Sequence, residues 1–368
     1  MRVRRFDARD TAAIARLNTR LQSGGALDVV YPEGSEQNRG GVVRERMFVA
    51  DDDGEIRGAV WLREQPFRID GADVLCGWLK YPVAESLVDP RFSGVPASLI
   101  IQCLREQPRL LALGLGGHQT PLARMLQALK WMGLTIPLVA RVVRPGRVLR
   151  RAPALRRTPL RAVAADVLAW TGVAAIAFTG WDIMSGARRR CARGNYIAEP
   201  CQELGTWADD VWQSVRDRYP FIAARDARTV DLLQPDSPDI QWLRVRQRGT
   251  DVGWVSIVQH DFAKGTPDHN FGTLRVGLIA DALAAPEHAR GVLIVAMEAL
   301  EAAGVDVILS NQLHQEWAQP LRDFGCLNVT SNFALYASPQ ASRLVRDWTR
   351  AHVNRGDCDG PLWYRGRN

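Results

Sequence analysis

The sequence contains few cysteines, and their spacing fits neither a disulfide framework nor a metal site. Six cysteines are scattered along 368 residues, without a Cys-x-x-Cys pair and without a histidine at metal-ligand spacing. Zinc sites and disulfide-stapled secreted domains both need closely spaced cysteines. We therefore expect reduced thiols, no bound metal and a cytoplasmic location. The first ten residues, MRVRRFDARD, also lack the apolar core of a secretory signal.

The sequence signatures of several enzyme classes are missing as well. The chain has no GxxxxGK[ST], HExxH or GxSxG pattern, so a P-loop, a zinc protease and a serine hydrolase have no support. The run GLGG at 114–117 has neither the spacing nor the element order of a dinucleotide-binding turn. None of these enzyme classes is therefore predicted.

An apolar segment at 163–184 is too short to span a membrane as a helix. Its uncharged stretch lies between Asp166 and Asp182 and would be about 22 Å long, whereas the hydrocarbon core of a bilayer is about 30 Å thick. Two alternatives stay open for this segment. It is either a helix buried between domains or an in-plane helix at a membrane surface, anchored by its basic flanks.

Acidic residues are absent from 141–161, where the positive charge is concentrated. The eight arginines of this segment are Arg141, Arg144, Arg147, Arg150, Arg151, Arg156, Arg157 and Arg161. The net charge of the whole chain is +7, so the remainder is close to neutral. We expect an acidic or membrane-bound partner, with peripheral contact to an anionic inner membrane face through 141–193. Aromatic interleaving and a recognition helix are missing, which argues against nucleic acid.

The rest of the chain has the composition of a globular protein, and its elements occur in two similar series. Hydrophobic residues make up 46% and charged residues 24%, and the length suits two domains. Periodicity and turn signals predict the series strand, helix, hairpin, strand, helix, strand, helix, strand twice. The first series comprises 1–10, 11–22, 46–65, 72–83, 91–104, 109–117, 120–134 and 136–143. The second comprises 195–204, 206–219, 240–259, 272–283, 285–304, 305–311, 315–327 and 332–338.

This repetition predicts a tandem α/β (α+β) protein. We expect one domain at 1–145, a basic linker with an apolar helix at 146–194, and a second domain at 195–368. Each domain would be a mixed, mostly antiparallel central sheet flanked by helices. The order of elements resembles the GNAT superfamily of N-acyltransferases, and two copies resemble its tandem members. The resemblance implies two GNAT-like domains, an acyl-CoA co-substrate and no metal.

The stretch RFSGVPAS, 91–98, resembles the GNAT donor loop, whose form is Gln/Arg-x-x-Gly-x-Gly/Ala. In that family, backbone amides and a helix N-terminus hold the pyrophosphate of acyl-CoA, because both favour an anion. The resemblance implies a cofactor site at Arg91, Ser93, Gly94, Val95, Ala97 and Ser98. Pro96 stands where a second small residue belongs and has no N–H. Two alternatives therefore stay open: a shifted register, with Ser93 in the Arg position and Ser98 in the last Gly position, and a helix start without a cofactor role.

The corresponding loop of the second series, 286–291, matches the family pattern less well. Only Gly291 fits, and Glu287 would repel a pyrophosphate. The family also commonly carries a tyrosine that protonates the departing thiolate, but Leu129 and Leu321 occupy the two equivalent positions. We therefore place the donor site in the first half, although both halves depart from the catalytic pattern.

The candidate catalytic side chains all follow predicted strands near the expected clefts. They are Tyr81, Glu85, His118 and His314. Tyr81 and Glu85 follow the strand that leads into the donor loop, and the two histidines follow corresponding buried strands. Surface, capping or packing roles remain open for each. Asp281, at the end of another strand, could orient an amine or a hydroxyl.

These observations lead to two hypotheses about function. The first is an N-acyltransferase that moves an acyl group from acyl-CoA, with acetyl-CoA preferred, to an amine. The acceptor would be a small molecule or glycan, such as an amino sugar in polysaccharide or cell-envelope synthesis. The second is a non-catalytic GNAT-like binding or scaffold protein at the membrane surface, which the missing tyrosines and Pro96 favour.

Overall fold

The structure is a computed structural model that describes most of the chain. It covers residues 1–26, 31, 37–39, 41–156, 158, 163, 168, 180, 185–234, 239–265 and 267–358, with the backbone alone at 37–39. The described elements form two mixed β-sheets flanked by helices, which confirms the predicted fold class. The apolar segment 163–184 lies almost entirely outside the described residues, so both alternatives for it stay predictions.

The first sheet carries helices on both faces. Its strands run in the order β1-β3-β4-β5-β6-β16-β7, with β2 on β3 and β10 on β4. Their bounds are β1 Arg2–Arg5, β2 Gln37–Arg39, β3 Val43–Asp52, β4 Glu55–Ile69, β5 Ala72–Ala84, β6 Leu110–Leu113, β7 Met132–Thr135, β10 Phe221–Ala223 and β16 Ala334–Ala337. Helix α1 (Thr11–Ser23) packs on one face; α2 (Val95–Glu106) and α3 (Pro121–Ala128) pack on the other.

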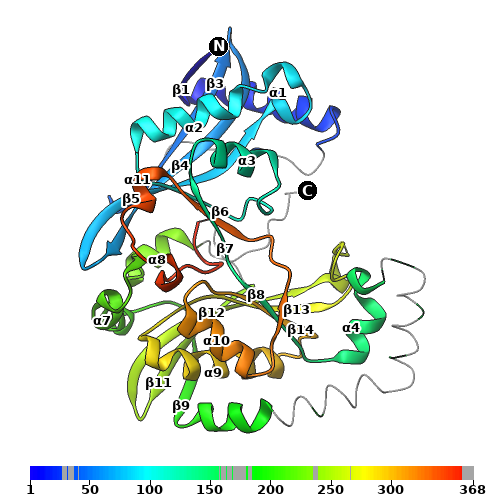
Figure 1. Cartoon of the computed structure of the whole chain (residues 1–368), viewed down its shortest axis with the longest axis vertical. Coiled ribbons are helices and arrows are strands. Elements are labelled where there is room, and N and C mark those ends of the chain that lie inside the picture. The colour runs from blue at the N-terminus through cyan, green and yellow to red at the C-terminus, as the bar shows by residue number, and fades with distance from the viewer. Residues whose placement is uncertain are drawn as a thin grey trace.

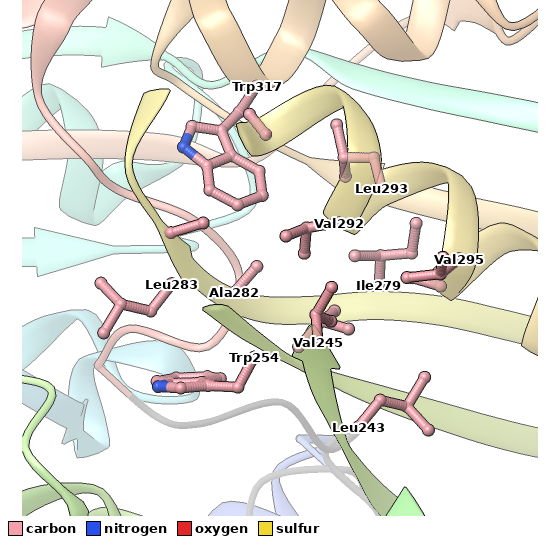
Figure 2. Packing of buried hydrophobic residues seen from close by; sticks show 14 of the residues in the cluster. Leu243, Val245, Trp254, Ile279, Ala282, Leu283, Val292, Leu293, Val295 and Trp317 are labelled. Carbon is pink, nitrogen blue, oxygen red and sulfur yellow. The ribbon is translucent and has the colours of Figure 1, made fainter. Parts of the chain in front are cut away.

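The second sheet has the strand order β15-β8-β14-β13-β12-β11-β9. Its strands are β8 Leu138–Val142, β9 Tyr196–Cys201, β11 Ile240–Gln247, β12 Thr250–Asp261, β13 Arg275–Ala284, β14 Val307–Asn311 and β15 Leu327–Val329. Helices α7 (Thr206–Val215), α9 (Ala289–Ala302) and α10 (Gln315–Asp323) cover it. Figure 2 shows Val292, Leu293 and Val295 of α9 with Trp317 of α10 against Ile279 of β13, a buried apolar layer.

The two halves exchange strands: the first half contributes β8 to the second sheet, and the second half contributes β10 and β16 to the first. Strand β8, expected to close the first series, pairs with β14 in the second sheet. Strand β16, expected to close the second series, lies between β6 and β7 of the first sheet. Figure 1 shows both crossing connections between the upper and lower halves. The prediction that each series closes its own sheet was therefore wrong, because hydrophobic patterning identifies a strand but not its partner.

Two further elements differ from the prediction. The helix expected to run to residue 134 ends at Ala128, and β7 follows it after a turn at Lys130, whose φ is +62°. A Cβ on Gly133 would lie 2.8 Å from the Tyr336 ring, so glycine lets β7 pack beside β16. The expected linker also begins with a helix, α4 (Pro145–Arg151).

The remaining described helices are short, and none of the described helices could cross a membrane. They are α8 Ala227–Leu233 and α11 Pro339–Ser342, together with a helical stretch at 185–193. Within the described ranges, no helix has both the length and the apolar character of a membrane span.

Candidate active site

In the first half, the pairing of two parallel strands ends early and leaves a break in the sheet, which we call the first cleft. Strands β5 and β6 pair from Gly77 to Leu79, opposite Leu110 to Ala112, and the pairing ends there. Just beyond the last pair, a register shift between β4 and β5 places Tyr81 at a φ of +47°. A bulge of this kind interrupts the ladder and re-aims backbone groups. The backbone of β5 after Leu79 therefore faces a gap in the sheet, on the side of β6.

The loop that follows β5 leads directly into the N-terminus of α2. Short-range bonds use the amides of Arg91, to the Asp89 side chain at 3.0 Å, and of Ser93, to the Pro90 carbonyl at 3.1 Å. The amides of Gly94, Val95 and Ala97 have no acceptor among the described residues. Free amides in the first turn of a helix form a site for an anion.

The side chains predicted at this loop differ in what they can contribute. Val95 is buried against the core, so only its backbone amide faces the loop. The exposed Arg91 side chain is paired with Asp89 at 2.7 Å. Ser98 donates its hydroxyl to the Gly94 carbonyl at 3.1 Å. Any anion held here would therefore be bound mainly by backbone groups.

Glu85 lies at the start of the same loop, and its carboxylate is an ion-pair centre. It is buried and lies 3.1 Å from Arg20 Nε and 3.1 Å from Arg57 Nη1. The Arg57 guanidinium in turn lies over the Phe92 ring, 4.5 Å from its centroid. These contacts fasten the loop to α1 and β4, as expected of a positioning residue. All of these contacts are with the protein itself, so they do not assign Glu85 a direct contact with a substrate.

His118 is placed away from the cleft. Its Nδ1 lies 2.5 Å from the Tyr336 hydroxyl and its Nε2 lies 2.8 Å from Thr135 Oγ1. These two partners belong to β16 and β7, which lie on the far side of β6 from β5. Gln127 also donates to the Tyr336 hydroxyl at 3.2 Å. Tyr336 reaches this face only through the strand exchange, so sequence order could not indicate the contact.

His314 caps a helix in the second half. Its Nδ1 accepts from the Glu316 amide at 3.2 Å, at the N-terminus of α10. Burial lowers the pKa of this imidazole to about 4, and the positive charge of Arg350 adds to the shift. The neutral ring packs edge-on against Tyr219, with ring centroids 5.0 Å apart. These contacts are those of a capping and packing residue.

The start of α9, which corresponds to the start of α2, is built differently. Glu287 there is ion-paired with Arg218 at 3.0 Å. A Cβ on Gly291 would lie 2.3 Å from the Tyr196 ring, so packing alone requires this glycine. The one residue of this loop that matched the family pattern is thus explained without a ligand.

The chain itself fills the cleft of the second half. Strands β13 and β14 pair from Val276 to Ile279 and then separate, as β5 and β6 do. The C-terminal segment, residues 351–358, lies in this gap. The Gly356 amide donates to the Ala280 carbonyl at 2.8 Å, and the Leu313 amide donates to the Val353 carbonyl at 3.0 Å. Asp281, which could have oriented a substrate, instead accepts from Arg225 at 3.0 Å.

Sequence reasoning missed a group of buried charges beside the first cleft. Glu45 accepts from Arg63 Nε at 2.6 Å and from Lys80 Nζ at 3.3 Å. The three residues come from β3, β4 and β5, and Lys80 directly follows the last residue of β5 that pairs with β6. In the sequence, Glu45 and Arg63 stand beside other charged residues, and this pattern alone indicates no site.

Solved structures with a similar arrangement include N-myristoyltransferase from Saccharomyces cerevisiae with bound myristoyl-CoA. That comparison has a TM-score of 0.52 and 11% identity, and covers 91% of this chain and 78% of the other. A GCN5-related N-acetyltransferase from Anabaena variabilis has a TM-score of 0.51 and 10% identity, covering 91% and 72%. This chain has a GNAT-like fold. At identities of 11% and 10%, this similarity shows the fold alone.

Comparisons by sequence add nothing to this assignment. No protein-family profile matches the chain, and no curated protein sequence matches it. Among the described residues, no three or more His, Cys, Asp or Glu side chains are grouped to hold a metal ion. The roles predicted for individual site residues therefore rest on geometry alone.

Proposed function

We propose that the protein is an acyl-CoA-dependent N-acyltransferase whose donor site lies in the first half. One observation carries the proposal: the separation of β5 and β6 is followed by a helix with free amides at Gly94, Val95 and Ala97. These amides and the dipole of α2 suit the pyrophosphate of CoA. The gap between the strands suits the extended pantetheine and acyl chain.

The second half lacks the features that suit a donor in the first half, and this difference supports the assignment. Its strand gap is occupied by residues 351–358, and the entrance to α9 carries the carboxylate of Glu287. A pyrophosphate at that position would meet a like charge. The occupied gap and the carboxylate of Glu287 support placing the donor in the first half.

In the proposed reaction, the amine nitrogen attacks the thioester carbonyl and forms an amide bond. The carbon–sulfur bond breaks, the CoA thiolate leaves, and the proton lost by the attacking nitrogen passes to that thiolate or to water. A thiolate needs little help to leave, so the main requirement is an uncharged amine. Of the predicted catalytic residues, Tyr81 stays a proposal: its backbone adjoins the end of the β5–β6 pairing, and its side chain packs against the α1 core. Glu85 is retained as a positioning residue for the donor loop, whereas His118 and His314 are proposed as structural.

The identities of the acyl donor and the acceptor are proposed from the fold and from the surface charge. We propose acetyl-CoA as a preferred donor and an acidic small-molecule or glycan amine, such as an amino sugar, as the acceptor. The supporting observation is the set of exposed arginines on α4 and the 185–193 helix. They are Arg147, Arg150, Arg151, Arg188 and Arg190. The same arginines support peripheral contact with an anionic membrane.

Donor binding is tested by titration calorimetry with acetyl-CoA and myristoyl-CoA. A Cβ at Gly94 meets no atom within 4 Å, so Gly94→Glu introduces a charge without a clash in the free protein. We expect acyl-CoA to bind about tenfold more weakly or worse, since like charges ~4 Å apart repel by roughly 1–4 kcal/mol. Gly94→Gln is the uncharged control of equal length.

Glu287→Gln is the matched variant in the second half. Because this loop is not proposed to hold the donor, we expect unchanged acyl-CoA affinity. If Glu287→Gln tightens binding while Gly94→Glu has no effect, the donor site has been placed in the wrong half. If neither acyl-CoA binds the wild-type chain, the transferase proposal fails.

A non-catalytic GNAT-like scaffold is the second candidate, favoured by Leu129 and Leu321 at the two tyrosine positions. Flotation with vesicles of phosphatidylcholine, with and without phosphatidylglycerol, tests it. A scaffold at an anionic surface would float only with phosphatidylglycerol and would bind no acyl-CoA. Binding of acyl-CoA together with turnover would exclude it.

A further inference from the structure

The C-terminal segment in the second cleft is held by a clamp of buried charges. Arg225 Nε donates to Asp281 at 3.0 Å, and Arg225 Nη2 donates to both carboxylate oxygens of Asp357 at 3.0 Å. The Asn354 amide side chain donates to the same Asp281 oxygen at 2.7 Å. All four residues are buried. Breaking one partner of such a buried pair leaves an uncompensated charge.

Close packing fixes the same segment against β13. A Cβ on Gly356 would lie 2.4 Å from the Cβ of Asp281, so the backbone of the segment touches the strand directly. On its other side, the His352 amide donates to the Phe221 carbonyl of β10 at 2.8 Å. Strand β10 belongs to the first sheet. The segment is therefore fastened to both sheets at once.

The end of the segment reaches the charged group beside the first cleft. The Cys358 carbonyl accepts from Arg63 Nη1, and the Cys358 thiol lies 3.9 Å from the Leu79 carbonyl. Arg63 in turn donates to Glu45, which also accepts from Lys80. Asp357 and Cys358 are adjacent in the chain, so an unbroken path runs from Arg225 in the second cleft to Lys80 in the first.

A small cavity lies along this path. It has a volume of about 20 Å³, and its lining includes Arg63, Gln65, Arg225, Asp281 and Asp357. A space of this size holds about one water molecule, and its polar walls supply the partners that a buried water needs. The two charged groups thus face a common space, with the C-terminal segment between them.

We propose that residues 351–358 permanently occupy the second cleft and that they position the Lys80–Glu45 pair at the first cleft. In this role Arg225 and Asp357 are positioning residues for the acyl transfer, a part of the inference that rests on the proposed function. The second half then serves as a support for the active half. It does not act as a second donor site.

Hydrogen–deuterium exchange of the full chain tests the positioning. In Asp357→Asn and Arg225→Gln, we expect amide exchange to rise by about tenfold or more in 351–358 and also in 78–84 of β5. Asp357→Glu keeps a carboxylate beside the small cavity. Both peptides should therefore be much better protected in this variant than in Asp357→Asn. Arg244→Gln is the control, because it removes a half-buried ion pair with Asp251 at the far side of the second sheet.

The possible results distinguish a failure of the positioning role from a failure of the proposed function. Faster exchange confined to 351–358 and β13, with 78–84 as in the wild type, would overturn the positioning. Calorimetry of the wild type should give one acetyl-CoA per chain, and two would contradict permanent occupancy of the second cleft. If acetyl-CoA does not bind, the transferase proposal fails, and exchange alone still decides whether the segment positions Lys80.

Discussion

At the scale of single residues, His314 shows how a cap can make stability depend on pH. Its imidazole accepts a backbone bond and is buried as the neutral form, which lowers its pKa to about 4. An unfolded histidine has a pKa near ~6.5. The folded pKa is the lower of the two, so the stability that this group contributes is complete above ~6.5 and is lost as the pH falls toward 4.

We predict that, through His314 alone, the free energy of unfolding falls by up to about 3 kcal/mol as the pH is lowered from 6.5 to 4. Asp357 acts in the opposite direction, because burial, together with the charge of Asp281, raises its pKa. Urea unfolding of the wild type and His314→Asn at several pH values isolates the histidine. Asparagine keeps the cap, so the variant should lose less stability on acidification. Equal losses in both proteins would refute the assignment.

Two glycines at corresponding helix starts have different physical roles. At Gly291 a methyl group would meet the Tyr196 ring at 2.3 Å, whereas at Gly94 it would meet nothing within 4 Å. We predict that Gly291→Ala destabilises the protein by about 1–3 kcal/mol through overpacking, and that Gly94→Ala is close to neutral. Thermal unfolding of the two variants measures this. A similar loss in both would mean that the loop at Gly94 carries strain or packing that the structure does not show.

Residue-level roles were the hardest to predict from sequence. The sequence placed His314 correctly after a buried strand, but it could not show that the ring would cap α10. His118 likewise has its partner in Tyr336, more than 200 positions away, and no local pattern links the two. The buried Glu45–Arg63–Lys80 group joins three strands. Its members are ordinary charged residues until the pairing of the strands is known.

At the scale of elements, the sequence predicted most helices and strands but not where each strand would pair. The Asp-Gly turn between β3 and β4, the hairpin of β11 and β12, and the helices α1, α2, α7, α9 and α10 follow local patterns and are confirmed. Strands β8 and β16 each have the pattern of a buried strand, which fits either sheet. Their exchange depends on the three-dimensional arrangement of the connections.

The exchange makes the two halves depend on each other for folding. Without β16, the first sheet has a gap between β6 and β7. We therefore predict that a fragment of residues 1–145 does not unfold cooperatively by circular dichroism. Co-expression with 146–368 should restore a folded complex. Cooperative unfolding of the isolated fragment would show that the exchange is dispensable.

At the scale of the whole molecule, each sheet contains a pair of parallel strands that separate, and the two gaps differ. One ends in a loop with free backbone amides, and the other is filled by the chain's own C-terminal segment. Sequence patterns predicted this asymmetry in part, through the mismatch at 286–291. They could not predict the filled cleft, because residues 351–358 carry no pattern that distinguishes a cleft-filling segment from an ordinary loop.

A crystal structure of the full chain with bound CoA would show which half holds the donor. We predict that the pyrophosphate lies within hydrogen-bonding distance of the Gly94, Val95 and Ala97 amides, with the pantetheine between β5 and β6 and residues 351–358 still in the second cleft. A pyrophosphate at the start of α9, with the C-terminal segment displaced, would contradict the account.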